Sequence, residues 1–254
     1  MTWRAELDFA HHLADVADEI TLDGFTRRVA ARTKHDGTPV TEADEACERA
    51  LRAEIAKAFP DHAVLGEEHG ASGDGSARWI LDPIDGTKNF ASGIPIWGTL
   101  IALEVEGEIV CGVISCPAMR ERYAAARGMG AERNGEAIRV SSVSTLRDAR
   151  VSYTSFLSFE SYGRGPGWHR LCDSATWARG FGDCWGHMLV ASGRVDVMAE
   201  PVVNVWDLAP IIVIVEEAGG RFTDLDGNRA LDRGSALSTN GTLHNEALAL
   251  LTAS

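Results

Sequence analysis

The chain has 254 residues, 45% of them hydrophobic, which is enough for one large core or two small domains. Its formal net charge of −13 argues against nucleic acid as a partner, because binding to a phosphate backbone needs a basic face. Its apolar runs are shorter than the ~18–20 residues of a membrane span, and its first residues form no apolar signal segment, so we expect no membrane partner and a cytoplasmic location.

The first half of the chain predicts two helices followed by a mainly antiparallel sheet. Helical spacing extends from about residue 5 to 31, and a second helix is expected from 41 to about 59. Residues 70–76 are expected to form a flexible loop, because they are rich in Gly and Ser. The predicted strands cover residues 63–66, 79–82, 97–106, 108–116, 122–126 and 137–140, with turns at Gly107 and at Asn134-Gly135.

The second half alternates between strands and helices, which predicts an α/β arrangement. Strands are expected at residues 150–153, 195–199, 221–223 and 236–238. Helices are expected at residues 167–173, 184–192, 207–218 and 243–251. No repeat or low-complexity linker separates the halves, so we expect residues 1–145 and 146–254 to pack tightly as two halves of one protein.

The five cysteines predict neither a disulfide framework nor a zinc ribbon. Their number is odd, and no two of them are spaced as C-x-x-C. Buried free thiols in a reducing compartment are the expected state of all five.

Three short acidic segments, at residues 66–68, 82–87 and 206–207, supply enough carboxylates to hold two or three Mg²⁺ ions beside a phosphate. Pro83 forces Asp82 into an extended conformation and fixes a turn that returns Asp85 to the same side. Gly86 and Thr87 then offer backbone N–H groups to phosphate oxygens. A metal-dependent phosphatase acting on a small phosphorylated metabolite is the prediction, since bound metal reverses the local negative field.

Each segment taken alone has a simpler interpretation. Asp-Pro-x-Asp-Gly is also good turn chemistry. Residues 66–68 can form a solvated loop, and Asp207 can be the N-cap of the helix that it opens. Thr41 and Asp44 stand in capping-box positions, so Asp44 can serve the helix alone.

The segments together resemble the inositol monophosphatase family. Residues 79–90 resemble its first signature, and residues 206–209 followed by 217–220 resemble its second. Residues 66–70 lie upstream at the family's spacing, as do Lys34 and the Thr-x-x-Asp segment at 41–44. Pro210 departs from the small residue usual there, but proline is tolerated in the first turn of a helix. The resemblance implies a layered α/β sandwich of alternating helices and sheets, usually assembled as a homodimer.

The resemblance also implies a metal site. Glu67, Asp82 and the carbonyl of Ile84 are implied to bind one Mg²⁺, and Asp82, Asp85 and Asp207 to bind a second. A third, weaker Mg²⁺ is implied near Glu67 through water molecules. Most of these ligands fall in residues 1–145, and Asp207 is contributed by residues 146–254.

Catalysis is implied to depend on Glu67, Thr87 and Asp44. Thr87 and Asp44 orient and deprotonate the attacking water, and the N–H groups of Gly86 and Thr87 hold the phosphate. Phosphoryl transfer of this kind needs positioning and charge neutralisation, and no covalent enzyme intermediate.

The C-terminal residues are expected to recognise the alcohol half of the ester. Two acids, Asp183 and Glu200, suit a cationic alcohol, and Trp177, Trp185 and His187 can flank a flat ring. An amine with a flat ring describes L-histidinol phosphate, and residues 179–183 and 199–201 resemble the histidinol-phosphatase branch of the family. The expected substrate contacts are Asp85, Asp183, Glu200, Trp185 and Arg179.

The prediction is therefore hydrolysis of L-histidinol phosphate, a step of histidine biosynthesis. Hydrolysis of inositol 1-phosphate, or of a broad range of small phosphate esters, is the alternative, in which Asp183 only caps a helix and the tryptophans belong to the core. A catalytically silent subunit is a third interpretation. It is disfavoured because Glu67, Asp82, Asp85, Thr87 and Asp207 are all present.

Overall fold

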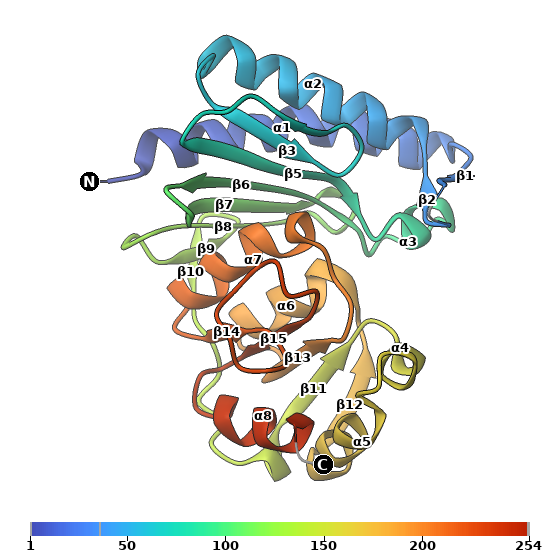
Figure 1. The fold of residues 1–254 in the computed structure, drawn as a ribbon, viewed down its shortest axis with the longest axis vertical. Coiled ribbons are helices and arrows are strands. Elements are labelled where there is room, and N and C mark those ends of the chain that lie inside the picture. Colours follow the sequence, from blue (N-terminus) through green and yellow to red (C-terminus); the bar gives the residue numbers. More distant parts are fainter. Residues whose placement is uncertain (1, 36, 253–254) are drawn as a thin grey trace.

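The computed structural model describes residues 2–35 and 37–252, and they form five alternating layers (Figure 1). Two long helices cover one face of a large sheet, and a central pair of helices separates this sheet from a smaller one. Further helices cover the outer face of the smaller sheet. The expected layered α/β fold is confirmed. No helix within the described residues is both long and apolar enough to cross a membrane.

The outer helices are α1 (Arg4–Arg27) and α2 (Glu42–Ala58). Helix α1 ends four residues earlier than the spacing predicted, because Arg28 adopts a left-handed conformation with φ 54° that stops the helix. Short strands β1 (Arg32–Thr33) and β2 (Pro39–Val40) pair with each other between the two helices. Helix α2 begins with the predicted capping box, in which the Thr41 side chain accepts from Ala43 N at 3.2 Å.

The large sheet has eight strands in the order β10-β9-β8-β7-β6-β5-β3-β4, and only the β3–β5 pair is parallel. Residues 70–72 pair with β3 as an edge strand, so the prediction of a loop over residues 70–76 was wrong at its start. The strands are β3 (Ala63–Gly66), β4 (Gly70–Ser72), β5 (Ala77–Asp85), β6 (Gly98–Val105), β7 (Glu108–Cys116), β8 (Glu121–Ala126), β9 (Ala131–Arg133) and β10 (Glu136–Ile138). Helix α3 (Thr87–Ala91) follows β5 directly.

The smaller sheet has five strands in the order β12-β11-β13-β15-β14. Its strands are β11 (Arg150–Tyr153), β12 (Trp177–Gly180), β13 (Val197–Glu200), β14 (Arg221–Thr223) and β15 (Ala236–Thr239). The accompanying helices are α4 (Phe156–Ser161), α5 (Gly165–Ser174), α6 (Asp183–Ala191), α7 (Val205–Glu217) and α8 (His244–Thr252). The sequence pattern predicted neither β12 nor α4, because both are short and half-exposed and carry little periodic signal.

Both faces of the large sheet are buried, and this explains its continuous apolar strands. On β5, Trp79 and Leu81 pack toward α1 and α2, whereas Ile80 between them packs toward α7. Helix α7 is enclosed between the two sheets, so its residues 208–215 are all buried. The strands and helices that meet at this central layer bring the acidic segments together.

Two sequence-based details of α7 were wrong. The helix begins at Val205 with Asn204 as N-cap, so Asp207 is not the N-cap residue. Asp207 occupies the third helical position and accepts the Asn204 backbone N–H at 2.7 Å, which completes a capping box. Pro210 consequently lies inside the helix and not in its first turn. Its ring packs closely against β7, where a Cβ on Gly112 would lie 2.7 Å from Pro210 Cα.

Candidate active site

A cavity of about 730 Å³ opens where the C-terminal end of β5 meets α3 and the N-termini of α6 and α7. Both sheets contribute to its wall, since the lining includes residues of β5 and of β12. The residues that line it are Thr38, Pro39, Glu67, Asp82, Ile84, Asp85, Gly86, Thr87, Lys88, Asn89, Ile94, Ile96, Thr154, Ser155, Gly180, Phe181, Gly182, Asp183, Val202, Asn204 and Asp207.

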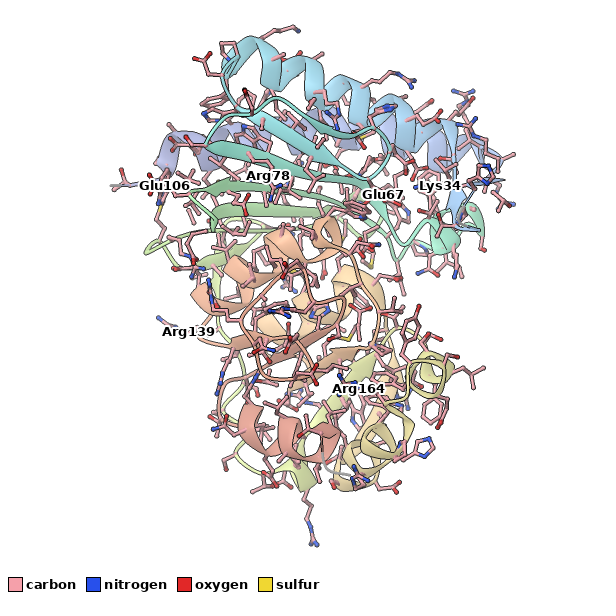
Figure 2. The ribbon with its side chains drawn as sticks, in the orientation of Figure 1. Lys34, Glu67, Arg78, Glu106, Arg139 and Arg164 are labelled. Carbon is pink, nitrogen blue, oxygen red and sulfur yellow. The ribbon has the colours of Figure 1, made fainter. Side chains whose placement is uncertain are left out.

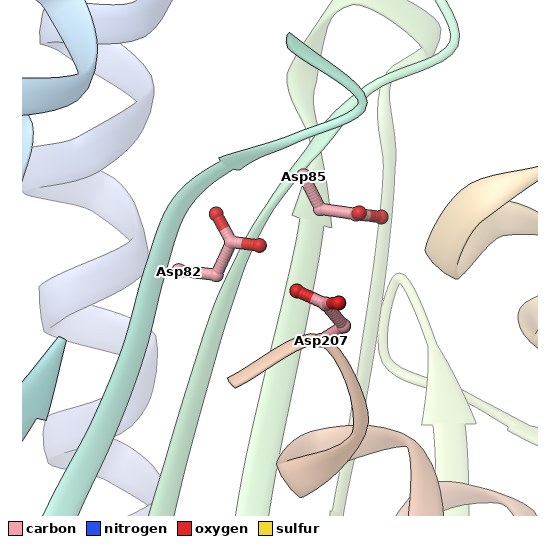
Figure 3. A group of neighbouring side chains, drawn as sticks. All are labelled: Asp82, Asp85 and Asp207. Atoms are coloured by element: carbon pink, nitrogen blue, oxygen red, sulfur yellow. The ribbon is translucent and has the colours of Figure 1, made fainter. Parts of the chain in front are cut away.

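Three aspartates converge in this cavity (Figure 3). One carboxylate oxygen each from Asp82, Asp85 and Asp207 can be chosen so that the three lie within 4.8 Å of one another. Pairing between β5 and β6 shifts register between Asp82 and Asp85, at the position of Pro83. This irregularity breaks the strand's alternation, so that both acids face Asp207 across the cavity.

Burial and mutual repulsion disfavour the charged forms of these three acids, and a bound cation would offset both effects. Burial, followed by repulsion from Glu67, Asp85 and Asp207, raises the pKa of Asp82 well above its usual range. Burial also raises the pKa of Asp85, with Asp183 and Asp207 adding repulsion. The pKa of Asp207 is raised to about 7, again mainly by burial. Oxygen ligands this close, with no protein cation hydrogen-bonded to them among the described residues, fit a hard divalent ion.

Glu67 enters the same cavity from the loop after β3 and is held by Lys34 (Figure 2). Lys34 Nζ donates to Glu67 Oε1 at 2.8 Å and to Glu68 Oε1 at 2.7 Å. Burial opposes the charged ammonium, but these two hydrogen bonds outweigh it and raise the pKa of Lys34. Burial raises the pKa of Glu68 to about 7. The two glutamates are therefore not a solvated loop, and only Glu67 of the pair lines the cavity.

Sequence reasoning missed Glu48, which holds the Glu67 loop in place. Its fully buried carboxylate accepts from Glu68 N at 2.7 Å, from His69 N at 3.2 Å and from Arg52 Nε at 2.7 Å. A buried acid on the apolar side of α2, one turn after Asp44, is the signal that could have identified it.

The turn after β5 places Ile84, Gly86 and Thr87 on the cavity wall. Ile84 N donates to Asp82 Oδ1 at 3.0 Å, and the Ile84 carbonyl accepts from the Thr87 hydroxyl at 3.0 Å. Gly86 has φ 84°, which other residues rarely adopt, and it is the N-cap of α3. The backbone of Gly86 and Thr87 is therefore presented to the cavity beside the three aspartates.

Asp44 lies behind this wall and serves the capping box. Its Oδ2 accepts from Thr41 N at 2.8 Å and from Thr41 Oγ1 at 2.5 Å. Its Oδ1 is buried without a hydrogen-bond partner among the described residues. Burial raises its pKa to about 6, and Glu67 adds repulsion. The structure brings Asp44 near Glu67 but does not hydrogen-bond it to Thr87 within the described residues.

Asp183 lines the cavity from the first position of α6, close to Asp85 and the turn at Gly86. It does not cap this helix with its side chain, because Gly182 is the N-cap residue and no side-chain cap bond is formed. Its Oδ2 accepts from Asn89 Nδ2 at 3.1 Å. Burial, then repulsion from Glu200, raises the pKa of Asp183 to about 7. The N-terminus of α6 also faces the three aspartates, since Cys184 N donates to Asp85 Oδ2 at 2.6 Å.

The other expected substrate contacts do not line the cavity. Glu200 is buried behind Thr154 and pairs with His187 Nε2 at 2.8 Å. Trp185 turns away and donates its indole N–H to Glu121 at 2.9 Å. Arg179 is exposed, with its guanidinium 5.9 Å from the Trp177 ring centroid. The aromatic ring that does line the cavity is Phe181, which lies in the segment 179–183 but was not among the expected substrate contacts.

The layered fold and the acidic cavity are those of a metal-dependent phosphatase. The family model described as the inositol monophosphatase family matches residues 3–254. The chain is 45% identical to a histidinol-phosphatase from Mycobacterium tuberculosis, over 98% of each chain. It is 44% identical to a histidinol-phosphatase from Streptomyces coelicolor, over 97% of this chain and 96% of that protein.

Structural comparison agrees with the sequence comparisons. The extragenic suppressor protein suhB from Bartonella henselae superimposes with a TM-score of 0.91 at 30% identity, covering 98% of this chain and 99% of that one. The chain belongs to the inositol monophosphatase family, as its motifs predicted.

Proposed function

We propose that the protein hydrolyses L-histidinol phosphate to L-histidinol and phosphate. The observation that carries this choice is Asp183, an acid on the cavity wall near Asp85 whose side chain is hydrogen-bonded to Asn89 and to no cation of the described chain. An amine is the natural partner for such a group. The histidinol-phosphatases to which the chain is 44–45% identical support the same substrate.

Two or three Mg²⁺ ions are proposed as cofactors. Asp82, Asp85 and Asp207, together with Glu67 and the carbonyl of Ile84, are the residues that would hold them. When bound, Mg²⁺ supplies positive charge to the phosphate and lowers the pKa of an attacking water molecule. The hydrogen bond from Lys34 orients Glu67 toward the cavity.

The remaining residues position the phosphate and the water. The backbone N–H groups of Gly86 and Thr87 are proposed to hold phosphate oxygens. Thr87 and Asp44 are proposed to orient the water and take up its proton. Support comes from the free Oδ1 of Asp44 and its pKa of about 6, which suits a base working near neutral pH.

On the substrate side, Asp183 is proposed to bind the amino group and Asp85 to contact the substrate beside the metal ions. Phe181 provides a flat apolar surface for the imidazole ring. Glu200 adds negative charge from behind Thr154, and its effect reaches Asp183 electrostatically. Trp185 and Arg179 lie outside the cavity and are not part of the proposed site.

We further propose that the protein acts in histidine biosynthesis, in the cytoplasm, and that it forms a homodimer. Within each chain, we propose that the two structural halves meet at about residues 145–146. The cytoplasmic location is supported by all five cysteines, which lie in the described residues and have free thiols. The division is supported by the two sheets, since the larger spans residues 63–138 and the smaller spans residues 150–239.

The test is phosphate release with Mg²⁺ from L-histidinol phosphate and from inositol 1-phosphate, measured side by side as kcat/KM. A preference of about a hundredfold or more for the aminated ester, roughly 2.7 kcal/mol, is expected. Asp183→Asn should remove most of this preference, and Asp173→Asn, which changes an exposed acid on α5, should not. Equal rates on the two esters in the unmodified protein would instead make it a general inositol-type phosphatase.

A further inference from the structure

A chain of hydrogen bonds, buried at its start, leads from the core of the smaller sheet to Asp183. It begins at Ser238 on β15, whose Oγ lies 2.7 Å from His187 Nδ1, and continues from His187 Nε2 to Glu200 Oε2 at 2.8 Å. His187 and Ser238 are fully buried, and Glu200 is 6% exposed. None of these three residues lines the cavity.

Thr154 connects this chain to the cavity. Its hydroxyl donates to Glu200 Oε1, and the same Oγ1 accepts the backbone N–H of Asp183 at 2.8 Å. A hydroxyl has a single hydrogen, so its donation to Glu200 turns an oxygen lone pair toward Asp183. Glu200 therefore accepts from Thr154 on one side, and His187 Nε2 lies within hydrogen-bond distance on its other side.

Asp183 needs such support because its backbone is strained. Its φ is 48°, in the left-handed region that residues with a Cβ seldom occupy. Among the described residues, its side chain is held by one hydrogen bond, from Asn89 Nδ2. Conformations of this kind persist where surrounding contacts enforce them, and they cluster at functional sites.

We infer that His187 is a positioning residue for substrate selection, acting through Glu200 and Thr154 to hold Asp183 in its substrate-facing conformation. The inference rests on the proposed role of Asp183 in binding the amine. His187 supplies the donor that Glu200 needs, since a buried carboxylate with an unsatisfied oxygen would rearrange or recruit another partner. Glu200 is then available to orient Thr154, and Thr154 to orient Asp183.

Two substitutions of His187 separate positioning from packing. His187→Gln keeps an N–H donor at about the place of Nε2 and so retains the bond to Glu200. His187→Asn places its amide near Nδ1 and loses that bond. His244 provides the matched control, because it is an equally buried histidine hydrogen-bonded to Thr223 and Thr239, away from the cavity.

We expect His187→Asn to lower kcat/KM for L-histidinol phosphate roughly tenfold or more, the scale of one lost buried hydrogen bond. For inositol 1-phosphate the loss should stay below about threefold, and His187→Gln should restore most of the activity. Hydrogen exchange followed by mass spectrometry should show faster exchange in a peptide covering residues 182–185. His244→Asn should change neither the ratio of the two kcat/KM values nor the exchange of this peptide.

Thr154→Val tests whether His187 influences Asp183 only through Thr154. This substitution alone should lower kcat/KM for the aminated ester. Adding His187→Asn should lower kcat/KM little further, because the hydrogen-bond connection between Glu200 and Asp183 is already lost. Additive losses, or equal losses on both esters with unchanged exchange at 182–185, would overturn the inference. If the unmodified protein shows no preference for the aminated ester, the proposed substrate is wrong, and the exchange of 182–185 in His187→Asn alone decides the positioning role.

Discussion

Asp207 does two things with one carboxylate. Its Oδ2 caps α7 by accepting from Asn204 N, while its charge lies among Asp82 and Asp85. The first role stabilises the helix, and the second destabilises a protein without bound cation, because burial and repulsion disfavour the ionised form. Sequence reasoning predicted that Asp207 belongs with Asp82 and Asp85 but not its place in the helix, since the capping role of Asn204 depends on backbone geometry that the residue types do not specify.

Substitution of Asp207 should therefore separate stability from activity. Asp207→Asn keeps an oxygen for the cap and removes the charge. We expect the metal-free protein to melt a few degrees higher at pH 7.5, at roughly 2–4 °C per kcal/mol of relieved repulsion. Phosphatase activity with Mg²⁺ should fall at least about a hundredfold, as expected for loss of a metal ligand. Calorimetry with a chelator and a phosphate-release assay measure the two effects, and a lower Tm together with retained activity would contradict both roles.

The buried His244, away from the cavity, should make the stability of the protein depend on pH. Burial, with Arg221 nearby, lowers its pKa from 6.5 to about 4. The unfolded chain therefore takes up a proton between pH 6.5 and 4 that the folded protein refuses, so stability is lost as the pH falls through this window. The shift corresponds to about 3 kcal/mol. Urea unfolding of His244→Asn should show a shallower fall in unfolding free energy between pH 6.5 and 4 than the unmodified protein; parallel curves would show that His244 does not titrate in this way.

At the scale of elements, the loop after β3 depends on a glycine that makes room for a buried acid. A Cβ on Gly66 would lie 2.1 Å from the Glu48 carboxylate that accepts the N–H groups of Glu68 and His69. Gly66 is thus required for packing between β3 and α2, and through that packing for the position of Glu67. The family motif contains this glycine, but only the structure supplies the reason for it.

Gly66→Ala should disturb both the fold and the metal site. Displacing Glu48 should cost about 1–3 kcal/mol of stability, the usual cost of overpacking. The Mg²⁺ concentration for half-maximal activity should rise, because Glu67 moves with the loop. Gly167→Ala is the control, since its Cβ would lie 2.4 Å from the Leu251 carbonyl, between α5 and α8 at the far end of the molecule (Figure 1). It should lower Tm without changing the Mg²⁺ dependence; an equal change in both variants would assign the Gly66 effect to stability alone.

The accuracy of the sequence-based prediction for each helix or strand depends on the length and periodicity of that element. The long strands β6 and β7 and the helices α1, α2 and α7 were predicted within a few residues, because their buried faces recur regularly. Strand β12 and helix α4 were missed, since each has four to six residues and is held by its neighbours. Arg179 on β12, like Trp185 on α6, was expected to contact the substrate, but neither side chain lines the cavity.

At the scale of the molecule, the acidic motifs are far apart in sequence and meet at one seam. Glu67, Asp82 and Asp85 come from the large sheet, whereas Asp207 and Asp183 come from the central helices beside the smaller one. The motifs predicted that these groups would meet, but not that Glu200 would lie behind Thr154, because that depends on how the two sheets pack. A cation held by Asp82, Asp85 and Asp207 would join the large sheet to α7, so its binding is coupled to the packing of that helix against the sheet.

This coupling predicts how Mg²⁺ stabilises the protein at different pH values. The pKa of Asp207 is about 7 in the folded chain, against 3.8 for an ordinary aspartate, and those of Asp82 and Asp85 are raised in the same direction. Without metal, the folded protein therefore binds more protons than the unfolded chain between pH 3.8 and about 7, so these groups reduce its stability as the pH rises through this window. Mg²⁺ competes with those protons, so its stabilising effect should grow over the same window.

The difference in Tm with and without saturating Mg²⁺ should accordingly be small at pH 5 and several degrees larger at pH 8. Taking the difference at each pH cancels the contribution of His244, which titrates in both samples alike. Asp207→Asn should flatten the dependence, because it removes one of the competing protons together with a ligand. A Tm difference that is the same at pH 5 and pH 8 would mean that the ion binds somewhere other than among these three carboxylates.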